Sequence, residues 1–225
     1  MKRRRNFKIS TKNKSYQIED SPLYKLKSKK KLYNLLKSNS QSINELLVDD
    51  GNYAVFNQIM GSKSRLIEHP SERLDLIHTR IASLLCRIKT PDYLHSGLKG
   101  RSHVTNAKAH IGNVPVLTTD VKSFFPSTSQ RKVFDFFYSI LECSPDVSDV
   151  LAKLCTFDGH IPTGSRISMP LAFWANICMF EELNSLSNKH SIKMTVYVDD
   201  ITFSGTDVNF LFKNVAKKSF LGMVI

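Results

Sequence analysis

The sequence lacks long apolar segments and paired cysteines. No stretch of its 225 residues approaches the roughly 18 consecutive apolar residues that a membrane-spanning helix needs. The basic start of the chain is not followed by the apolar segment of a secretory signal. The four cysteines form no Cys-x-x-Cys pair, which disfavours zinc and is typical of buried thiols in a reducing compartment. We therefore predict a cytoplasmic protein that does not enter a membrane.

Negative charge is scarce at the start of the chain. Residues 1–31 hold 12 Lys and Arg against Glu19 and Asp20, whereas the rest of the chain holds 20 against 18 acids. Most of the net charge of +12 therefore belongs to this basic lead-in. Such a segment can neutralise phosphates and bind nucleic acid regardless of its sequence. It can equally be a solvated lead-in that has no ligand.

The order of predicted elements favours one fold class. A hydrophobic content of 41% suits a globular core of one or two domains. Strands and helices alternate without the regular βαβ rhythm of a doubly wound sheet, which favours an α+β fold with an antiparallel central sheet. Apolar spacing predicts strands at 53–59 and 65–68, and helices within 32–47 (broken near 38–40), 70–88, 133–141, 144–154, 170–186 and 208–219.

Two adjacent aspartates lie between two apolar, β-branched runs in the stretch Lys193–Ser204. This pattern predicts a hairpin with Asp199 and Asp200 at its turn. Within a strand, adjacent side chains point to opposite faces, but at a turn both carboxylates can reach one cation. The alternative is an ordinary acidic turn without a ligand.

A further carboxylate, Asp120, ends the apolar run that begins at Val114. The run predicts a buried strand that carries the carboxylate at its end. Asp120 could instead cap the following helix. However, Ser127, Thr128 and Ser129 already offer caps for that helix, so Asp120 is not needed there.

Several motifs occur in an order that is typical of one family. The later motifs are Asp120 with Phe124–Ser127, Pro162–Ser165 with Ser168 and Pro170, and Tyr197–Asp200; the upstream segments are Arg65–Ile67 with Pro70, and Gly97 through Gly100–Ser102 to Asn106 and His110. The later motifs resemble the palm motifs of reverse transcriptases, most closely those of the bacterial retron type. The upstream segments resemble the fingers of the same enzymes, so the resemblance covers roughly residues 50–225.

The resemblance implies a right-hand polymerase fold, in which an antiparallel palm sheet adjoins helical and β fingers. It divides the chain into a basic lead-in (1–31), N-terminal helices and fingers (32–112), and an incomplete palm with the catalytic carboxylates (113–225). The family's later lysine motif, primer grip and thumb helices are not found. We therefore expect a chain that is truncated before the thumb.

The resemblance also implies roles for individual residues. Asp120 and Asp199 are the principal ligands of two Mg²⁺ ions, or of Mn²⁺ in their place, with Asp200 and the carbonyl of Val121 supporting them. Many members of the family carry Gln where Thr163 stands, which leaves the usual contact of this loop in doubt, and a structural loop is the alternative. The dNTP-binding residues implied are Arg65, Phe125 as a gate against the 2′-hydroxyl, Thr163 and Gly164, and the nucleic-acid-binding residues are Arg101, Asn106 and Tyr197. The alternative for Phe125 is a core phenylalanine.

Three functions are compatible with these residues. The first is an RNA-directed DNA polymerase that uses dNTPs on a structured noncoding RNA as template and primer, forming an RNA–DNA hybrid. By resemblance it acts in a retron system of phage defence, beside an accessory effector protein. The second is an RNA-binding palm scaffold that does not polymerise without a thumb or partner. The third, an RNA-templated RNA polymerase, is disfavoured by Phe125 and by Tyr197–Asp200.

Overall fold

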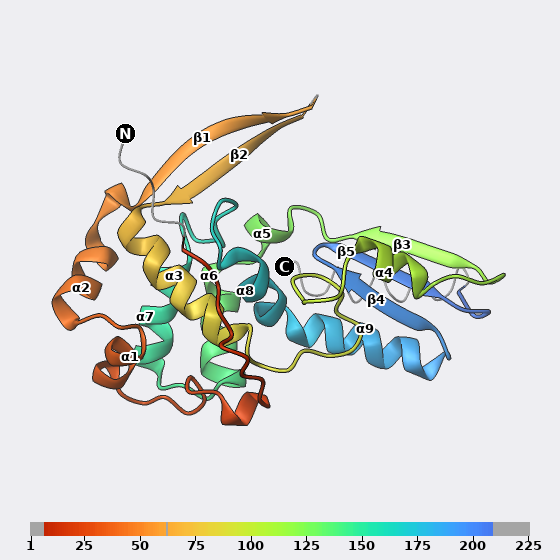
Figure 1. The fold of residues 1–225 in the computed structure, drawn as a ribbon, viewed down its shortest axis with the longest axis horizontal. Helices are drawn as coiled ribbons and strands as arrows, with labels where there is room; N and C mark the ends of the chain where they lie inside the picture. The colour runs from red at the N-terminus through yellow and green to blue at the C-terminus, as the bar shows by residue number, and fades with distance from the viewer. Residues whose placement is uncertain (1–6, 62, 209–225) are drawn as a thin grey trace. The chain divides into compact units, whose positions relative to one another are not determined.

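Helices and antiparallel strands alternate along the chain, which confirms the α+β class (Figure 1). The structure is a computed structural model that describes residues 7–61 and 63–208. In this part of the chain no helix combines the length and the apolar character needed to cross a membrane. The chain forms two units, Met1–Lys89 with Thr128–Ala175 and Thr90–Ser127 with Asn176–Ile225. Each unit therefore combines two separate stretches of sequence.

The first unit is mainly helical, and α3 (Glu72–Leu85) lies at its centre. Ser71 caps α3 by accepting a hydrogen bond from the N–H of Leu74 at 3.4 Å. The helix buries Ile81 and Leu84 completely, so its apolar stripe faces the core of the unit. The other helical segments here are η1 (Ile18–Asp20), α1 (Lys29–Leu35), α2 (Ser40–Val48), η2 (Asp50–Asn52), α6 (Gln130–Asp135), η3 (Phe136–Ile140), α7 (Pro145–Cys155) and α8 (Ser168–Ala175).

A two-stranded hairpin also belongs to this unit. Strand β1 (Tyr53–Met60) pairs antiparallel with β2 (Lys63–Pro70) along its whole length. The base of the hairpin is packed, because the ring of Tyr53 lies 4.5 Å from that of Phe157. Near the turn, by contrast, Ile59 is 80% exposed. Within the described residues neither strand pairs with a third one, so the hairpin is held at its base.

The second unit is built on a three-stranded antiparallel sheet in the order β3–β5–β4. Strand β5 (Asp200–Ser204) lies in the middle and pairs with β3 (Val116–Asp120) on one side and β4 (Lys193–Tyr197) on the other. Helices α4 (His103–Lys108) and α9 (Ile177–Lys189) both pack against β4. The sheet therefore presents the end of β3 and the start of β5 at one edge.

Most elements expected from apolar spacing are present. The N-terminal helices separate at residues 38–40, both strands of the fingers-like segment pair, and α3 and α7 occupy their predicted positions. The predicted hairpin is confirmed, but its turn consists of Val198 and Asp199, and Asp200 is already the first residue of β5, not part of the turn. These elements share a strong local pattern of apolar residues, which is why the sequence alone indicates them.

The single helix predicted over 170–186 is wrong. The segment forms α8 and α9, which are separated at Asn176, where φ is −110° and ψ is 17°. Asparagine is unfavourable inside a helix because its side chain competes for backbone hydrogen bonds. Leu171 and Leu183 therefore belong to different helices.

Two expectations about burial are also wrong in part. Strand β3 is not buried: Val116 is 51% exposed, because among the described strands β3 lies at the edge of its sheet. Cys143 and Cys155 are buried as expected, but Cys178 is exposed. The helix predicted over 133–141 is present, although its second half is a π-helix. Residues 209–219 of the helix predicted over 208–219 lie outside the described part of the chain.

Candidate active site

Three aspartates from distant parts of the sequence meet at one edge of the second unit's sheet. Asp120, the last residue of β3, is the register partner of Asp200, the first residue of β5. Asp199 lies in the turn before Asp200, and its carbonyl oxygen accepts a hydrogen bond from the N–H of Val121 at 2.9 Å. Antiparallel pairing thus places the ends of β3 and of the β4–β5 turn together.

The turn that carries Asp199 has an uncommon backbone. Val198 has a φ of 61°, in the left-handed region that β-branched residues rarely occupy. The turn has two residues and a positive φ at the first only, which is the pattern of a type II′ hairpin turn, where glycine is usual. Strain of this kind persists where the surrounding structure enforces it, and it is frequent at functional sites.

Replacing Val198 by glycine tests this strain. The left-handed conformation costs a non-glycine residue about 1–2 kcal/mol, whereas glycine loses about 0.5–1 kcal/mol through its freer unfolded chain. We therefore expect Val198→Gly to leave the free energy of unfolding unchanged or to raise it by up to about 1 kcal/mol. Urea unfolding measures it, with Val196→Gly, at a buried strand position, as the destabilised control. A clear loss in Val198→Gly would show that the turn is not strained.

The three carboxylates of the site repel one another. Partial burial raises the pKa of the Asp200 carboxyl, and the charges of Asp199 and then Asp120 raise it further. The three carboxylates are therefore close enough to interact electrostatically. Such a carboxylate is stabilised when a proton or a cation neutralises its charge.

The donor types at this edge suit a hard divalent cation. Mg²⁺ prefers carboxylate and carbonyl oxygens and usually keeps several water ligands, so a few protein oxygens suffice. Within residues 7–61 and 63–208, no group of three or more His, Cys, Asp or Glu side chains is arranged to hold a metal ion. The donor types and the backbone placement suit a divalent cation, whereas the described side chains do not form a ligand group.

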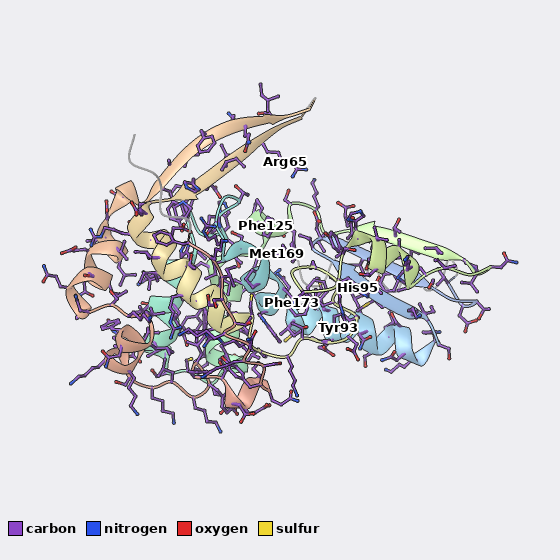
Figure 2. The ribbon with its side chains drawn as sticks, in the orientation of Figure 1. Arg65, Tyr93, His95, Phe125, Met169 and Phe173 are labelled. Atoms are coloured by element: carbon purple, nitrogen blue, oxygen red, sulfur yellow. The ribbon has the colours of Figure 1, made fainter. Side chains whose placement is uncertain are left out.

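The two phenylalanines after Asp120 have different surroundings. Both belong to α5 (Phe124–Ser127). Phe124 is 4% exposed and its ring lies 6.3 Å from that of Phe180, so it is a core residue. Phe125 is only half-buried, with its ring 5.6 Å from Phe124 (Figure 2). Phe125 therefore keeps a surface that a ligand could touch.

The predicted nucleic-acid-binding residues of this unit lie on or near α4. Arg101 donates to the carbonyl oxygens of Asp92 and Leu94, so its guanidinium holds the loop before α4. The buried Oδ1 of Asn106 has no hydrogen-bond partner among the described residues. Tyr197 is half-buried and meets His103 edge-to-face, with ring centroids 6.3 Å apart.

His110, part of a motif noted in the sequence, connects α4 with the sheet. Its ring nitrogens lie 2.6 Å from Ser204 Oγ on β5 and 2.6 Å from Thr195 Oγ1 on β4. Burial, followed by the positive charges of Lys193 and His95, lowers the pKa of His110. The residue is therefore best satisfied as a neutral ring that ties the two strands together.

The remaining predicted residues belong to the first unit. Arg65 is exposed and projects from β2 (Figure 2). Thr163 donates its hydroxyl to the carbonyl oxygen of Leu66 at 2.7 Å. A Cβ at Gly164 would lie 2.7 Å from the carbonyl oxygen of Glu68, so glycine is required by close packing on β2.

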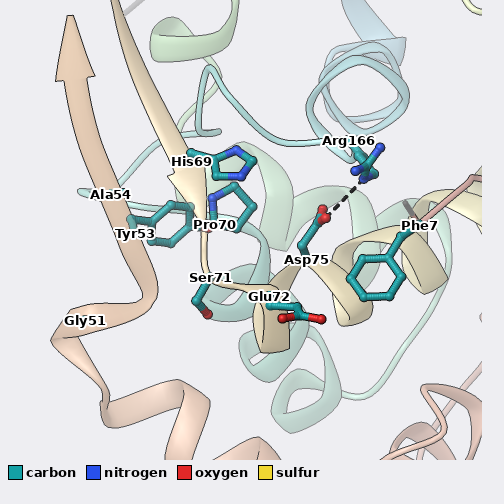
Figure 3. Close-up of a pocket in the computed structure, with 10 residues that line it drawn as sticks. All are labelled: Phe7, Gly51, Tyr53, Ala54, His69, Pro70, Ser71, Glu72, Asp75 and Arg166. Atoms are coloured by element: carbon teal, nitrogen blue, oxygen red, sulfur yellow. Dashed lines mark hydrogen bonds and ion pairs between the residues drawn. The ribbon is translucent and has the colours of Figure 1, made fainter. Parts of the chain in front are cut away.

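A cavity of about 620 Å³ also lies in this unit, between the base of the hairpin and the start of α3 (Figure 3). The Arg166 guanidinium contributes to its wall and pairs with Asp75, with Nε 3.1 Å from Oδ2. None of the residues predicted for the candidate active site lines this cavity.

Comparison with known proteins identifies the relatives of the chain. No protein-family model matches the sequence. The chain is 31% identical over 180 residues to the Retron Se72 reverse transcriptase of Salmonella heidelberg, covering 78% of this chain and 45% of the relative. It is 31% identical over 166 residues to the Retron Mx65 reverse transcriptase of Myxococcus xanthus (65% and 39%). It is 28% identical over 164 residues to the Retron Ec86 reverse transcriptase of Escherichia coli (72% and 50%).

By sequence, the chain matches retron reverse transcriptases at 26–31% identity over 65–90% of its own length. This confirms the resemblance drawn from the motifs. The chain spans about half, or less, of the length of these curated relatives.

Glu68 and His160 were not singled out from the sequence. Glu68 is 3% exposed, and its carboxylate contacts both His160 and the backbone of Thr163. A glutamate within a strand gives no sign of this, because its partners lie more than 90 residues away. Only a buried position for Glu68 in the strand pattern could have drawn attention to it.

Proposed function

We propose that this chain carries the catalytic carboxylates of an RNA-directed DNA polymerase, which extends a primer on a structured noncoding RNA. The observation that carries the proposal is the register pairing of Asp120 with Asp200, beside the turn with Asp199, in a retron-type chain. A scaffold that only binds RNA has no need for three like charges at one sheet edge, because their repulsion is unfavourable.

In this proposal the acids hold two divalent ions. Asp120 and Asp199 are the main ligands, while Asp200 and the Val121 carbonyl support them. When bound there, two such ions, Mg²⁺ or Mn²⁺, would supply the positive charge that activates the primer hydroxyl and stabilises the leaving pyrophosphate. The protein contributes the placement of the oxygens, through the pairing of β3 with β5 and the hydrogen bond from Val121 to Asp199.

Other residues recognise the nucleotide. Arg65 offers a guanidinium, whose fork suits triphosphate oxygens. Phe125, half-buried after the Asp120 strand, selects deoxynucleotides by excluding a 2′-hydroxyl. Thr163 and Gly164 form the loop that approaches the nucleotide. Residues 32–112 then serve as N-terminal helices and fingers, and residues 113–225 as the palm.

The nucleic acid is a structured noncoding RNA and the hybrid made from it. The basic lead-in (1–31) binds phosphates without reading sequence. Arg101, Asn106 and Tyr197 contribute on the sheet side of the second unit. The membership in the retron type supports a further proposal, that the chain acts in phage defence beside an effector protein.

Primer extension tests the proposal directly. The protein is given a primer annealed to RNA, dNTPs and Mg²⁺, and is compared with Asp199→Asn/Asp200→Asn, which keeps the shape of the turn. We expect extension by the parent, a loss of at least about 10³-fold in the double variant, and no extension when a chelator removes the metal. Comparison of dNTPs with rNTPs separates DNA from RNA synthesis.

Two results would contradict the proposal. Equal extension by the parent and the double variant would show that these acids are not catalytic. Silence of a folded parent that still binds the RNA would favour the second function, an RNA-binding scaffold without polymerase activity.

A further inference from the structure

The carboxylate of Glu68 is buried near the base of the hairpin, two residues before the end of β2. Glu68 is 3% exposed. Its Oε2 accepts the backbone N–H of Thr163 at 2.9 Å, and its Oε1 lies 3.0 Å from Nε2 of His160. A buried carboxylate is strongly unfavourable unless it is paired and hydrogen-bonded, so both partners are needed for Glu68 to stay in place.

The other ring nitrogen of His160 also faces an acceptor. Its Nδ1 lies 3.0 Å from the carbonyl oxygen of Asp158. A carbonyl and a carboxylate both accept, so the ring satisfies both partners only when each nitrogen carries a proton. The His160 and Glu68 side chains form a hydrogen-bonded pair with little exposure, since they are 19% and 4% accessible.

The loop of residues 160–166 is in backbone contact with β2. Thr163 Oγ1 donates to the carbonyl oxygen of Leu66 at 2.7 Å, so this residue binds the strand through both its amide and its hydroxyl. At Gly164 an added Cβ would lie 2.7 Å from the Glu68 carbonyl oxygen and 2.8 Å from Ile67 Cγ2. We name these contacts of Glu68, His160, Thr163 and Gly164 the hairpin–loop junction.

The far side of the loop is fixed to α3. Ser165 Oγ lies 2.6 Å from Nδ1 of His78, and Arg166 Nε lies 3.1 Å from Asp75 Oδ2. Figure 3 shows the Arg166–Asp75 pair beside the start of α3. The loop therefore connects the hairpin with the helical core of the first unit.

The outer part of the hairpin has no comparable support. Its residues from Val55 to Leu66 whose side chains are described are exposed, and in the described chain the two strands pair only with each other. Arg65 lies in this outer part, three residues from Glu68, which is roughly 10 Å along a strand. A change of direction at the junction therefore moves the Arg65 side chain.

We propose that Glu68 is a positioning residue that fixes the hairpin on the loop 160–166 and thereby holds Arg65 where it meets the triphosphate. This inference rests on the proposed function of Arg65. It gives Thr163 a role in this chain that a direct nucleotide contact does not explain: its amide and hydroxyl bind the hairpin. Glu68 itself touches no substrate.

Steady-state kinetics with dNTP as the varied substrate provide the first test. Misplacement of a substrate-binding group costs up to about 10²-fold, so we expect Glu68→Ala to raise KM at least about tenfold with kcat within about threefold. Glu68→Gln should restore KM, because its amide accepts from Thr163 and donates to a neutral His160. Glu45→Ala, at an exposed glutamate paired with Arg73 on the same unit, is the matched control. A fall in kcat alone would contradict the proposal.

A double-mutant cycle with Arg65 separates positioning from mere stability. If Glu68 acts through Arg65, the effect of Glu68→Ala on KM should shrink to less than about twofold in an Arg65→Ala background. Equal effects in both backgrounds would overturn the inference. If Glu68→Ala does not fold, His160→Ala serves in the cycle, because it removes one of the two partners of the carboxylate.

Hydrogen exchange tests the junction without any polymerase activity. We expect faster amide exchange in residues 160–166 and at the base of the hairpin in Glu68→Ala, with α7 unchanged. Unchanged exchange at both sites would show that Glu68 does not hold the hairpin. The parent could lack extension activity while Glu68→Ala still shows the faster exchange. This result would contradict the proposed function and leave the junction itself supported. In that case the positioning role of Glu68 for the triphosphate is overturned with the activity.

Discussion

Asp120→Asn is expected to abolish primer extension while leaving the fold intact. Asn keeps the shape of the side chain but removes one charged ligand, and loss of metal-mediated stabilisation of several kcal/mol corresponds to about 10³-fold in rate. Asp120 faces Asp200 in the sheet register, and the negative charge of Asp120 contributes to the raised pKa of the Asp200 carboxyl. Removing this repulsion should leave the free energy of unfolding unchanged or slightly higher.

Two measurements on the same samples check this outcome. Primer extension gives the activity, and urea unfolding gives the stability. Asp149→Asn is the matched control, because Asp149 on α7 has a side chain that is 51% accessible and pairs with Lys153. Extension by Asp120→Asn at the rate of the parent would remove Asp120 from the catalytic residues. A simultaneous loss of stability would indicate a structural role instead.

Acidification from pH 6.5 to 4 is expected to destabilise the first unit through His78. The ring is completely buried, with Nε2 2.7 Å from the Leu154 carbonyl oxygen and Nδ1 2.6 Å from Ser165 Oγ. A carbonyl only accepts, so Nε2 carries the proton of the neutral ring and Nδ1 accepts from Ser165. Burial lowers the pKa of His78 to about 4, against weaker opposing effects of the Leu154 hydrogen bond and the charge of Asp75.

The direction in which pH changes the free energy of unfolding follows from whether the folded or the unfolded chain binds the proton. Between pH 6.5 and 4 the unfolded chain takes up a proton at His78 and the folded chain does not, so the free energy of unfolding falls as the pH falls. The stabilisation is present above pH 6.5, and its loss should reach about 3 kcal/mol below pH 4.

Urea unfolding at pH 7 and pH 4.5 measures this loss. His78→Gln is the control, because an amide can donate to Leu154 and accept from Ser165 without titrating. The other histidines are present in both proteins, so the difference between the two pH dependences isolates His78. The same slope in parent and variant would show that His78 is protonated in the folded state.

Local patterns allowed most helices and strands to be predicted, and tertiary contacts account for the failures. The spacing of Ile81 and Leu84 is a property of one helix, so it is visible in the sequence. The division at Asn176 is different, because α8 and α9 belong to different units and the apolar residues on both sides continue without a gap. The exposure of Val116 likewise depends on which strands flank β3.

Part of the candidate site could be predicted from the sequence. The hairpin turn at Asp199 follows from the apolar runs on either side, and the resemblance to retron enzymes brings in Asp120. The pairing of Asp120 with Asp200 joins residues 80 positions apart, which no local pattern can indicate. The contact between Glu68 and His160 could not be predicted for the same reason, because it joins two distant segments of the chain.

The interleaving of the two units constrains how the chain can fold as it is synthesised. The first unit needs residues 128–175, which follow the first stretch of the second unit, and the second unit needs residues after 176. Neither unit can therefore close until most of the chain has left the ribosome. Segments such as β3 must wait for a partner about 80 residues later, and such non-local pairing slows folding. A chaperone that shields β3 during this interval would be expected to raise the yield of folded protein.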